Sequence, residues 1–171
     1  MPIFGKSTNS FRGQLPNETV LLATRRHWFV LFISMLLVVL LILFPFIIHY
    51  LLASQSWNNE NIESLFKLLV SIYLLFVWNL AFYNIVLYSL NTLIITDKRI
   101  VENKQLGLFK NVVNEIELDK VQDVSVKIYG PIASFLDYGD IEVQSAGATN
   151  KFFFTQFPNP QEIKKTILDS I

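Results

Sequence analysis

The 171-residue chain contains no cysteine, which excludes disulfides, thiolate zinc sites and cysteine nucleophiles. It has only two histidines, His27 and His49, which fall at opposite ends of one apolar run and so cannot share a site within one chain. The formal net charge is zero, which argues against strong nucleic-acid binding through bulk electrostatics. The sequence therefore predicts no catalytic residue, no cofactor, no metal site, no small-molecule substrate and no nucleic-acid partner.

Charge is also missing from two long stretches. No acidic or basic residue lies between Arg26 and Glu60, and none lies between Lys67 and Asp97. Because roughly 20 apolar residues at ~1.5 Å rise each cross the hydrocarbon core, these stretches predict two transmembrane helices, at about residues 28–50 and 66–90. Both are apolar on every side, which a soluble bundle of this size could not cover.

A cleaved signal peptide is the alternative for the first stretch, since paired arginines precede an apolar run. That run is too long for a signal-peptide core, and no small-x-small cleavage site follows it. We therefore prefer the membrane span.

The basic residues predict how the two spans are oriented. The loop between them carries Glu60 and Glu63 but no lysine or arginine, whereas basic residues precede the first span, namely Lys6, Arg12, Arg25 and Arg26. The positive-inside rule then places both termini in the cytoplasm. We expect a cytoplasmic N-terminal arm at residues 1–26, a transmembrane helical hairpin at 27–90 and a cytoplasmic domain at 91–171.

After Asn91 the apolar pattern changes to the period of two that antiparallel strands show when one face meets water. Asp97-Lys98 is a candidate two-residue turn. Near the end, Asn159-Pro160-Gln161-Glu162 reads as a helix start, and Ile163, Ile167 and Ile171 form one apolar stripe. The sequence predicts an α+β protein, in which a two-helix transmembrane hairpin precedes an antiparallel β roll or barrel capped by a C-terminal α-helix.

Three segments in this order resemble the bacterial pleckstrin-homology-like domain of YdbS-like membrane proteins (bPH2/DUF304). They are TDKRIVENKQLGLFKNVVNEIELDKVQDVSV, GPIASFLDYGDIEVQSAG and FPNPQEIKKTI, and the segment PNETVLLATRRHWFVLF before the first span is similar to that family as well. The resemblance implies a PH-like roll closed by the terminal helix and a place in the bacterial cytoplasmic membrane. The loop between the first strands is shorter than in phosphoinositide-binding PH domains, which argues against inositol-phosphate binding.

Six basic residues are candidates for contact with anionic lipid head groups, each worth at most about 1 kcal/mol: Arg25, Arg26, Lys98, Arg99, Lys104 and Lys110. The alternative is that they set the topology and solvate the surface. Residues 91–171 carry nine basic and eleven acidic side chains, a net charge of 9 − 11 = −2, which opposes a general attraction to such lipids.

Two other groups of polar residues have competing interpretations. Asn79 and Asn84 lie inside the second span, where interhelical hydrogen bonding is a better account than a transport path. Asp137, Asp140 and Glu142 could imitate a metal-binding loop, but their spacing matches no EF-hand, so we expect a solvated strand face.

We hypothesise a non-enzymatic membrane protein that presents the PH-like domain for protein interaction or scaffolding. The expected partners are the lipid bilayer and either a second copy or another membrane protein. The alternatives are a module that senses anionic lipid and an accessory subunit of a transport or envelope-stress complex.

Overall fold

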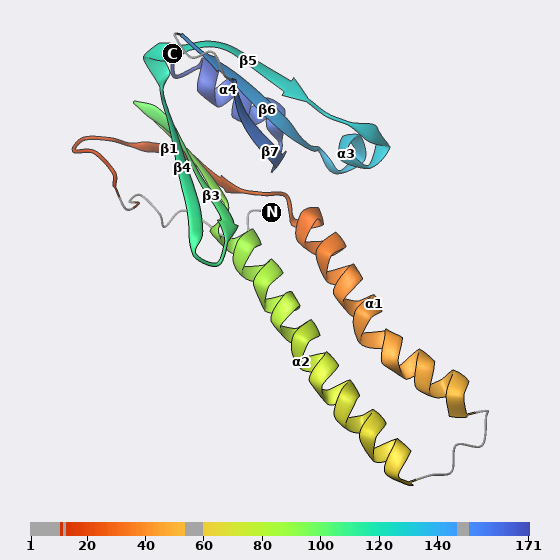
Figure 1. Ribbon diagram of the computed structural model, residues 1–171. Coiled ribbons are helices and arrows are strands. Elements are labelled where there is room, and N and C mark those ends of the chain that lie inside the picture. The colour runs from red at the N-terminus through yellow and green to blue at the C-terminus, as the bar shows by residue number, and fades with distance from the viewer. Residues whose placement is uncertain (1–10, 12, 54–59, 147–150) are drawn as a thin grey trace. The chain divides into compact units, whose positions relative to one another are not determined.

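The computed structural model describes residues 11, 13–53, 60–146 and 151–171 (Figure 1). Part of the expected loop between the spans lies outside the described residues. The chain forms two compact units: one consists of Trp28–Tyr88, and the other combines the residues up to His27 with Ser89–Ile171.

The helical unit contains α1 (Trp28–Ala53) and α2 (Glu60–Leu90), both long and apolar enough to cross a membrane. α2 begins at Glu60, before the expected span, and in this first part Glu63 and Lys67 form an ion pair of 2.6 Å one turn apart. The two helices are joined through side chains: the Tyr73 hydroxyl donates to the Leu41 carbonyl at 2.9 Å.

The second unit is a roll of two antiparallel sheets, in the strand orders β1-β2-β3-β4 and β5-β6-β7. The first sheet contains β1 (Val20–Arg25), β2 (Thr92–Thr96), β3 (Arg99–Gly107) and β4 (Lys110–Glu117). The second contains β5 (Val121–Lys127), β6 (Tyr138–Ser145) and β7 (Phe152–Pro158). Between the sheets lies a short 3-10 turn, η1 (Leu118–Lys120), and α3 (Gly130–Leu136) joins β5 to β6. The Asp97-Lys98 turn and the antiparallel pattern are confirmed.

The roll starts before the helices, which differs from the division expected from the sequence. β1 pairs with β2, with Arg25 opposite Thr92 and Thr24 opposite Leu93. Residues 20–25 are therefore the first strand of the roll and not part of a separate arm. The helical hairpin is an insertion between two neighbouring strands, and residues 91–171 alone lack one edge of the first sheet.

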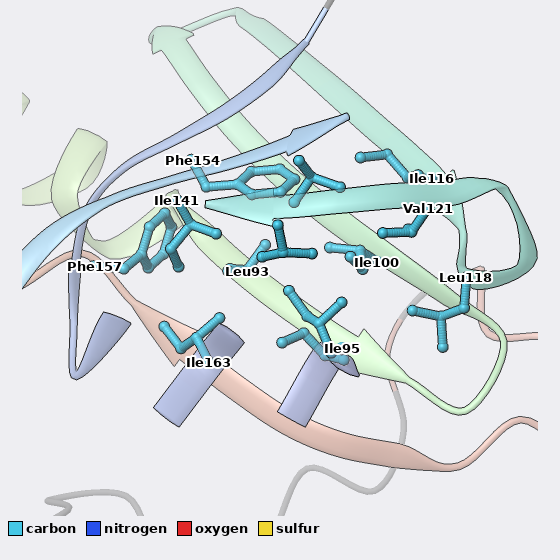
Figure 2. Close-up of a cluster of buried hydrophobic side chains, with 13 residues drawn as sticks. Leu93, Ile95, Ile100, Ile116, Leu118, Val121, Ile141, Phe154, Phe157 and Ile163 are labelled. Carbon is cyan, nitrogen blue, oxygen red and sulfur yellow. The ribbon is translucent and has the colours of Figure 1, made fainter. Parts of the chain in front are cut away.

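The core lies between the two sheets, where Leu93, Ile141 and Phe154 meet (Figure 2). The terminal helix α4 (Pro160–Leu168) buries Ile163 and Ile167 against it, as the stripe predicts. Ile171 lies beyond the end of α4 and is exposed, so the stripe is one residue shorter than expected. Burial of each large aliphatic side chain contributes about 1.5–3 kcal/mol, and this holds the helix on the sheets.

The start of α4 is stabilised differently from the expected N-cap. Asn159 has a left-handed backbone (φ 46°) and makes no side-chain cap to the helix backbone. Its backbone N–H donates to the carbonyl of Asp137, and its side-chain amide donates to the carboxylate of Glu162 at 3.2 Å. The helix start is therefore tied to the segment that precedes β6.

Candidate functional site

The strand register defines two ends of the roll. The attached end is the end from which both long helices extend: β1 leads into α1, and β2 follows α2. There Arg25 lies opposite Thr92. At the distal end, the turn from Thr96 to Arg99 joins β2 to β3. The length of β2 separates the ends by about 13 Å at ~3.3 Å per residue.

The distal end is organised by the sequence Thr96-Asp97-Lys98-Arg99. The Thr96 hydroxyl accepts hydrogen bonds from the backbone N–H groups of Lys98 (3.2 Å) and Arg99 (3.0 Å), which closes the turn. It also lies 2.9 Å from Oε1 of Glu18. The threonine thus links the turn to the segment that precedes β1.

Glu18 is the buried centre of this network. Arg99 donates to both of its carboxylate oxygens, from Nε at 2.9 Å and from Nη2 at 3.0 Å, a bidentate pairing. The backbone N–H of Leu15 donates at 2.6 Å as well. The Arg99 hydrogen bond is the main cause that lowers the pKa of Glu18 from 4.5 to about 2. The carboxylate is therefore ionised at neutral pH despite its burial.

Arg99 has further partners and is almost enclosed. Its Nη1 donates to Glu115 at 2.7 Å, and its Nη2 donates to the Gly13 carbonyl at 2.7 Å. Its pKa is raised, chiefly by the hydrogen bond with Glu18. The side chain is 12% exposed, so its charge is used within the protein.

The attached end is closed mainly by backbone contacts. The N–H of His27 donates to the Gln156 carbonyl at 2.7 Å, which joins the end of β1 to β7. The His27 ring stacks on Tyr138 with centroids 5.0 Å apart, and its burial lowers its pKa. At Gly139 a Cβ would lie 2.7 Å from the Lys127 carbonyl oxygen, so β5 and β6 approach too closely there for a side chain.

Glu142 lies on β6 and is buried, although strand alternation predicts a solvated residue. Lys127 contacts its carboxylate at 2.5 Å and Lys151 reaches the other oxygen. The Lys127 hydrogen bond is the main cause that lowers its pKa. Among the described residues no group of three His, Cys, Asp or Glu side chains could hold a metal ion. The buried carboxylate of Glu142 is covered by two partly exposed lysines that form ion pairs with it.

A model of the bacterial PH domain family (bPH_2) matches residues 19–171. The chain belongs to the bacterial PH domain family. The match begins at β1 and runs through both helices, in agreement with a domain that starts before the helical hairpin. Glu18 lies one residue outside it.

A solved structure offers a more distant likeness to this bacterial PH domain. It is a DUF1696-family protein with a pleckstrin-homology domain from Shewanella loihica, 16% identical over 47% of this chain and 71% of its own, with a TM-score of 0.39. Comparison with curated proteins gives no match.

The six candidate head-group residues do not gather in one place on the bacterial PH domain. Lys98 and Arg99 lie at the distal end, where Lys98 Nζ donates to the Pro16 carbonyl at 3.1 Å. The other four lie at the attached end or beyond it: Arg25 is the last residue of β1, Arg26 follows it, and Lys104 and Lys110 lie on the β3–β4 hairpin. Arg26 also donates to the Thr155 hydroxyl at 3.3 Å. Head-group contact stays a prediction, and the geometry favours it for these four.

Asn79 and Asn84 each donate to the carbonyl one turn earlier in α2, Leu75 and Leu80 respectively, at 2.8 Å. These two side-chain hydrogen bonds therefore lie within one helix and do not join α2 to α1. Asn79 is exposed on the helix. The predicted interhelical contact stays a prediction.

A shallow hollow of about 370 Å³ opens at the distal end of the bacterial PH domain. Its lining combines charges of both signs, such as Lys98, Glu117 and Lys120, with three apolar side chains, Leu15, Ile116 and Phe152. Lys120 and Glu117 pair with each other at 2.5 Å. Nothing in this lining resembles a nucleophile with its base, so the hollow suits contact with another surface better than chemistry.

Thr96 and Arg99 lie in the first segment that resembles the family, but the sequence alone does not reveal their partner. Glu18 precedes β1 by two residues and lies 81 positions from Arg99. In the sequence, the signal for Glu18 is that it is an acidic residue within the segment PNETVLLATRRH. That segment is similar to the family, but the similarity assigns no role to Glu18.

Proposed function

We propose that this protein holds its bacterial PH domain at the cytoplasmic face of the bacterial inner membrane, as a non-enzymatic platform for protein interaction. The observation that carries the proposal is the insertion of both apolar helices between β1 and β2. Orientation with both termini in the cytoplasm is supported by the basic residues before α1 and the acidic residues at the start of α2.

Two covalent links give the domain a property that soluble PH domains lack. α1 begins at Trp28, directly after the closing residue His27, and α2 ends at Leu90, two residues before β2. Almost no linker remains, so the domain needs no lipid affinity to stay at the membrane. Confinement near a surface raises its effective concentration toward other membrane-bound proteins.

The distal end is the surface that this arrangement leaves for a partner. It lies a strand length from both links, and its hollow offers charges of both signs around Leu15 and Phe152. Interfaces between proteins commonly combine an apolar centre with a polar rim. A non-enzymatic role is supported by the polar network beneath it, where the charges of Glu18 and Arg99 are already matched.

Site-specific photocrosslinking in native membranes tests the proposal. A photoreactive amino acid at Glu117, in the distal hollow, is expected to give a discrete crosslink to a second copy or another protein. The photoreactive amino acid placed instead at Gln122, an exposed position on β5, is the matched control. Absence of a Glu117-dependent adduct under gentle conditions would contradict the platform, and a periplasmic reporter signal after Ile171 would contradict the orientation.

Recognition of anionic lipid is a second candidate, favoured by the position of Lys104 and Lys110. Both lie on the β3–β4 hairpin, whose strands continue past Thr92 at the attached end. Replacing both with glutamine in the full chain should weaken the attraction to anionic nanodiscs by about 1 kcal/mol per residue at most, and salt should mask the difference. Lys165→Gln on α4 is the control. Equal behaviour of both variants at low salt would exclude this candidate.

A further inference from the structure

The tip of the β3–β4 hairpin carries exposed apolar side chains that the fold does not use. Phe109 is fully exposed, and Leu106 and Leu108 are each about half exposed. Lys104 and Lys110 flank them, and no acidic residue occurs from Asn103 to Asn111. Apolar tips with basic flanks are typical of segments that lie in the membrane interface.

The register places this tip beyond the attached end. Thr92, the first residue of β2, lies opposite Asn103. β3 then continues for four residues to Gly107 before the chain turns back into β4. At ~3.3 Å per residue, the tip extends about 13 Å past the point where β2 meets the chain from α2.

A second apolar projection lies at the same end. In and beside α3, Tyr129, Ile132 and Phe135 recur every three residues and are exposed, Phe135 at 88%, whereas Ala133 is buried. α3 lies beyond the ends of β5 and β6 (Figure 1). The first residue of β6, Tyr138, stacks on His27, the last residue before α1.

We propose that these six side chains form an interfacial anchor, in which the hairpin tip and α3 insert into the boundary between lipid head groups and acyl chains. The inference rests on the proposed function, because it requires both long helices to span the membrane. Exposed apolar side chains are stabilised when they leave water for the membrane interface, and aromatic residues are enriched in that interface.

A lipid surface fits these projections better than a protein partner does. Both projections lie at the end of the roll that carries the links to α1 and α2, and these links consist of only one or two residues. The anchor adds a contact with the membrane to the two covalent links and so limits tilting of the domain. The distal hollow then faces away from the membrane.

The absence of cysteine allows a direct test on the full chain. Single variants Phe109→Cys and Phe135→Cys carry an environment-sensitive NBD fluorophore in nanodiscs that contain spin-labelled quencher lipids. Asp119→Cys, exposed in the turn at the distal end, is the control. We expect blue-shifted emission and quenching by lipid at positions 109 and 135, but not at 119. Because insertion is apolar, both should persist at about 1 M salt, where the Debye length is about 3 Å.

One further label separates failure of the anchor from failure of the proposed function. Leu75→Cys lies in α2 and should be quenched by lipid in every case. Quenching at position 75 but water-like emission at 109 and 135 would overturn the anchor alone. Water-like emission at 75 as well would overturn the membrane span. A blue shift at 109 and 135 in native membranes but not in pure lipid would overturn the anchor in favour of a protein partner.

Discussion

The two ends of the roll differ in the side chains that they bury and expose. The distal end buries the carboxylate of Glu18 and neutralises it with Arg99, which also reaches Glu115. The attached end is closed by a backbone hydrogen bond from His27 to Gln156, and it exposes large apolar side chains. An end that faces water must match its charges, whereas an end that meets lipid can leave apolar groups uncovered. This contrast supports the proposal that the attached end adjoins the bilayer.

β1 is the element that both ends share. Glu18 precedes it at the distal end, and His27 follows it at the attached end. It also pairs with β2 across an insertion of two helices. The integrity of the domain therefore depends on residues that lie before the two long apolar helices.

The largest expected effect comes from removing β1 altogether. Residues 91–171 expressed alone should show no cooperative unfolding, because Leu93 and Ile95 would lose the neighbouring strand and Arg99 would lose Glu18. A chain that joins residues 13–25 to 92–171 through a two-residue turn should fold, since Arg25 and Thr92 are paired. Amide dispersion in NMR spectra distinguishes the two. A well-folded 91–171 fragment would contradict the assignment of β1 to the roll.

Breaking the distal network comes next. Glu18→Gln leaves the enclosed guanidinium of Arg99 without its main charge partner and should cost about 3 kcal/mol. The matched control is Glu115→Gln, where the carboxylate is 50% exposed and the loss should stay below about 1 kcal/mol. Pulse proteolysis of the detergent-solubilised chain in urea measures both. Equal losses would show that burial of Glu18 is not what makes the pair important.

The attached end should be sensitive to volume rather than to charge. Gly139→Ala adds a Cβ that would lie 2.7 Å from the Lys127 carbonyl oxygen, so a strand must move at a cost of about 1–3 kcal/mol. Gln122→Ala, at an exposed position of β5, is the control and should have little effect. The same urea experiment applies, and an unchanged midpoint for Gly139→Ala would mean that β5 and β6 can separate freely there.

Acid should weaken the two ends over different pH ranges. Glu18 has a folded pKa of about 2 against an ordinary 4.5, so its contribution is complete above pH 4.5 and is lost as the pH falls toward 2. His27 has a folded pKa below its ordinary 6.5, because burial disfavours its charged form, so stability also falls as the pH drops below 6.5. Glu18→Gln should remove the lower dependence, and His27→Asn the upper one. Urea midpoints measured across pH test this, and a profile that neither variant changes would refute both assignments.

Local patterns were sufficient to predict the long helices, the antiparallel strands and the capping helix. Runs without charge, a period of two and the isoleucines at positions 163 and 167 each depend on residues close together in the chain. The burial of Glu142 was not predictable in this way. Its alternation with Ile141 and Val143 indicates a solvated face, and only the positions of Lys127 and Lys151 explain why the carboxylate is covered.

By itself, the sequence determined that two apolar helices accompany an antiparallel domain with a terminal helix, because hydrophobic period and length are local properties. Only the tertiary structure decided that β1 belongs to that domain, that Glu18 meets Arg99 across 81 residues, and that Phe109 and Phe135 lie at the attached end. Strand register across the helical insertion sets the first two, whereas the β2–β3 register places Phe109 and the connection from β5 to β6 places Phe135. Register results from packing between strands and not from the local sequence alone.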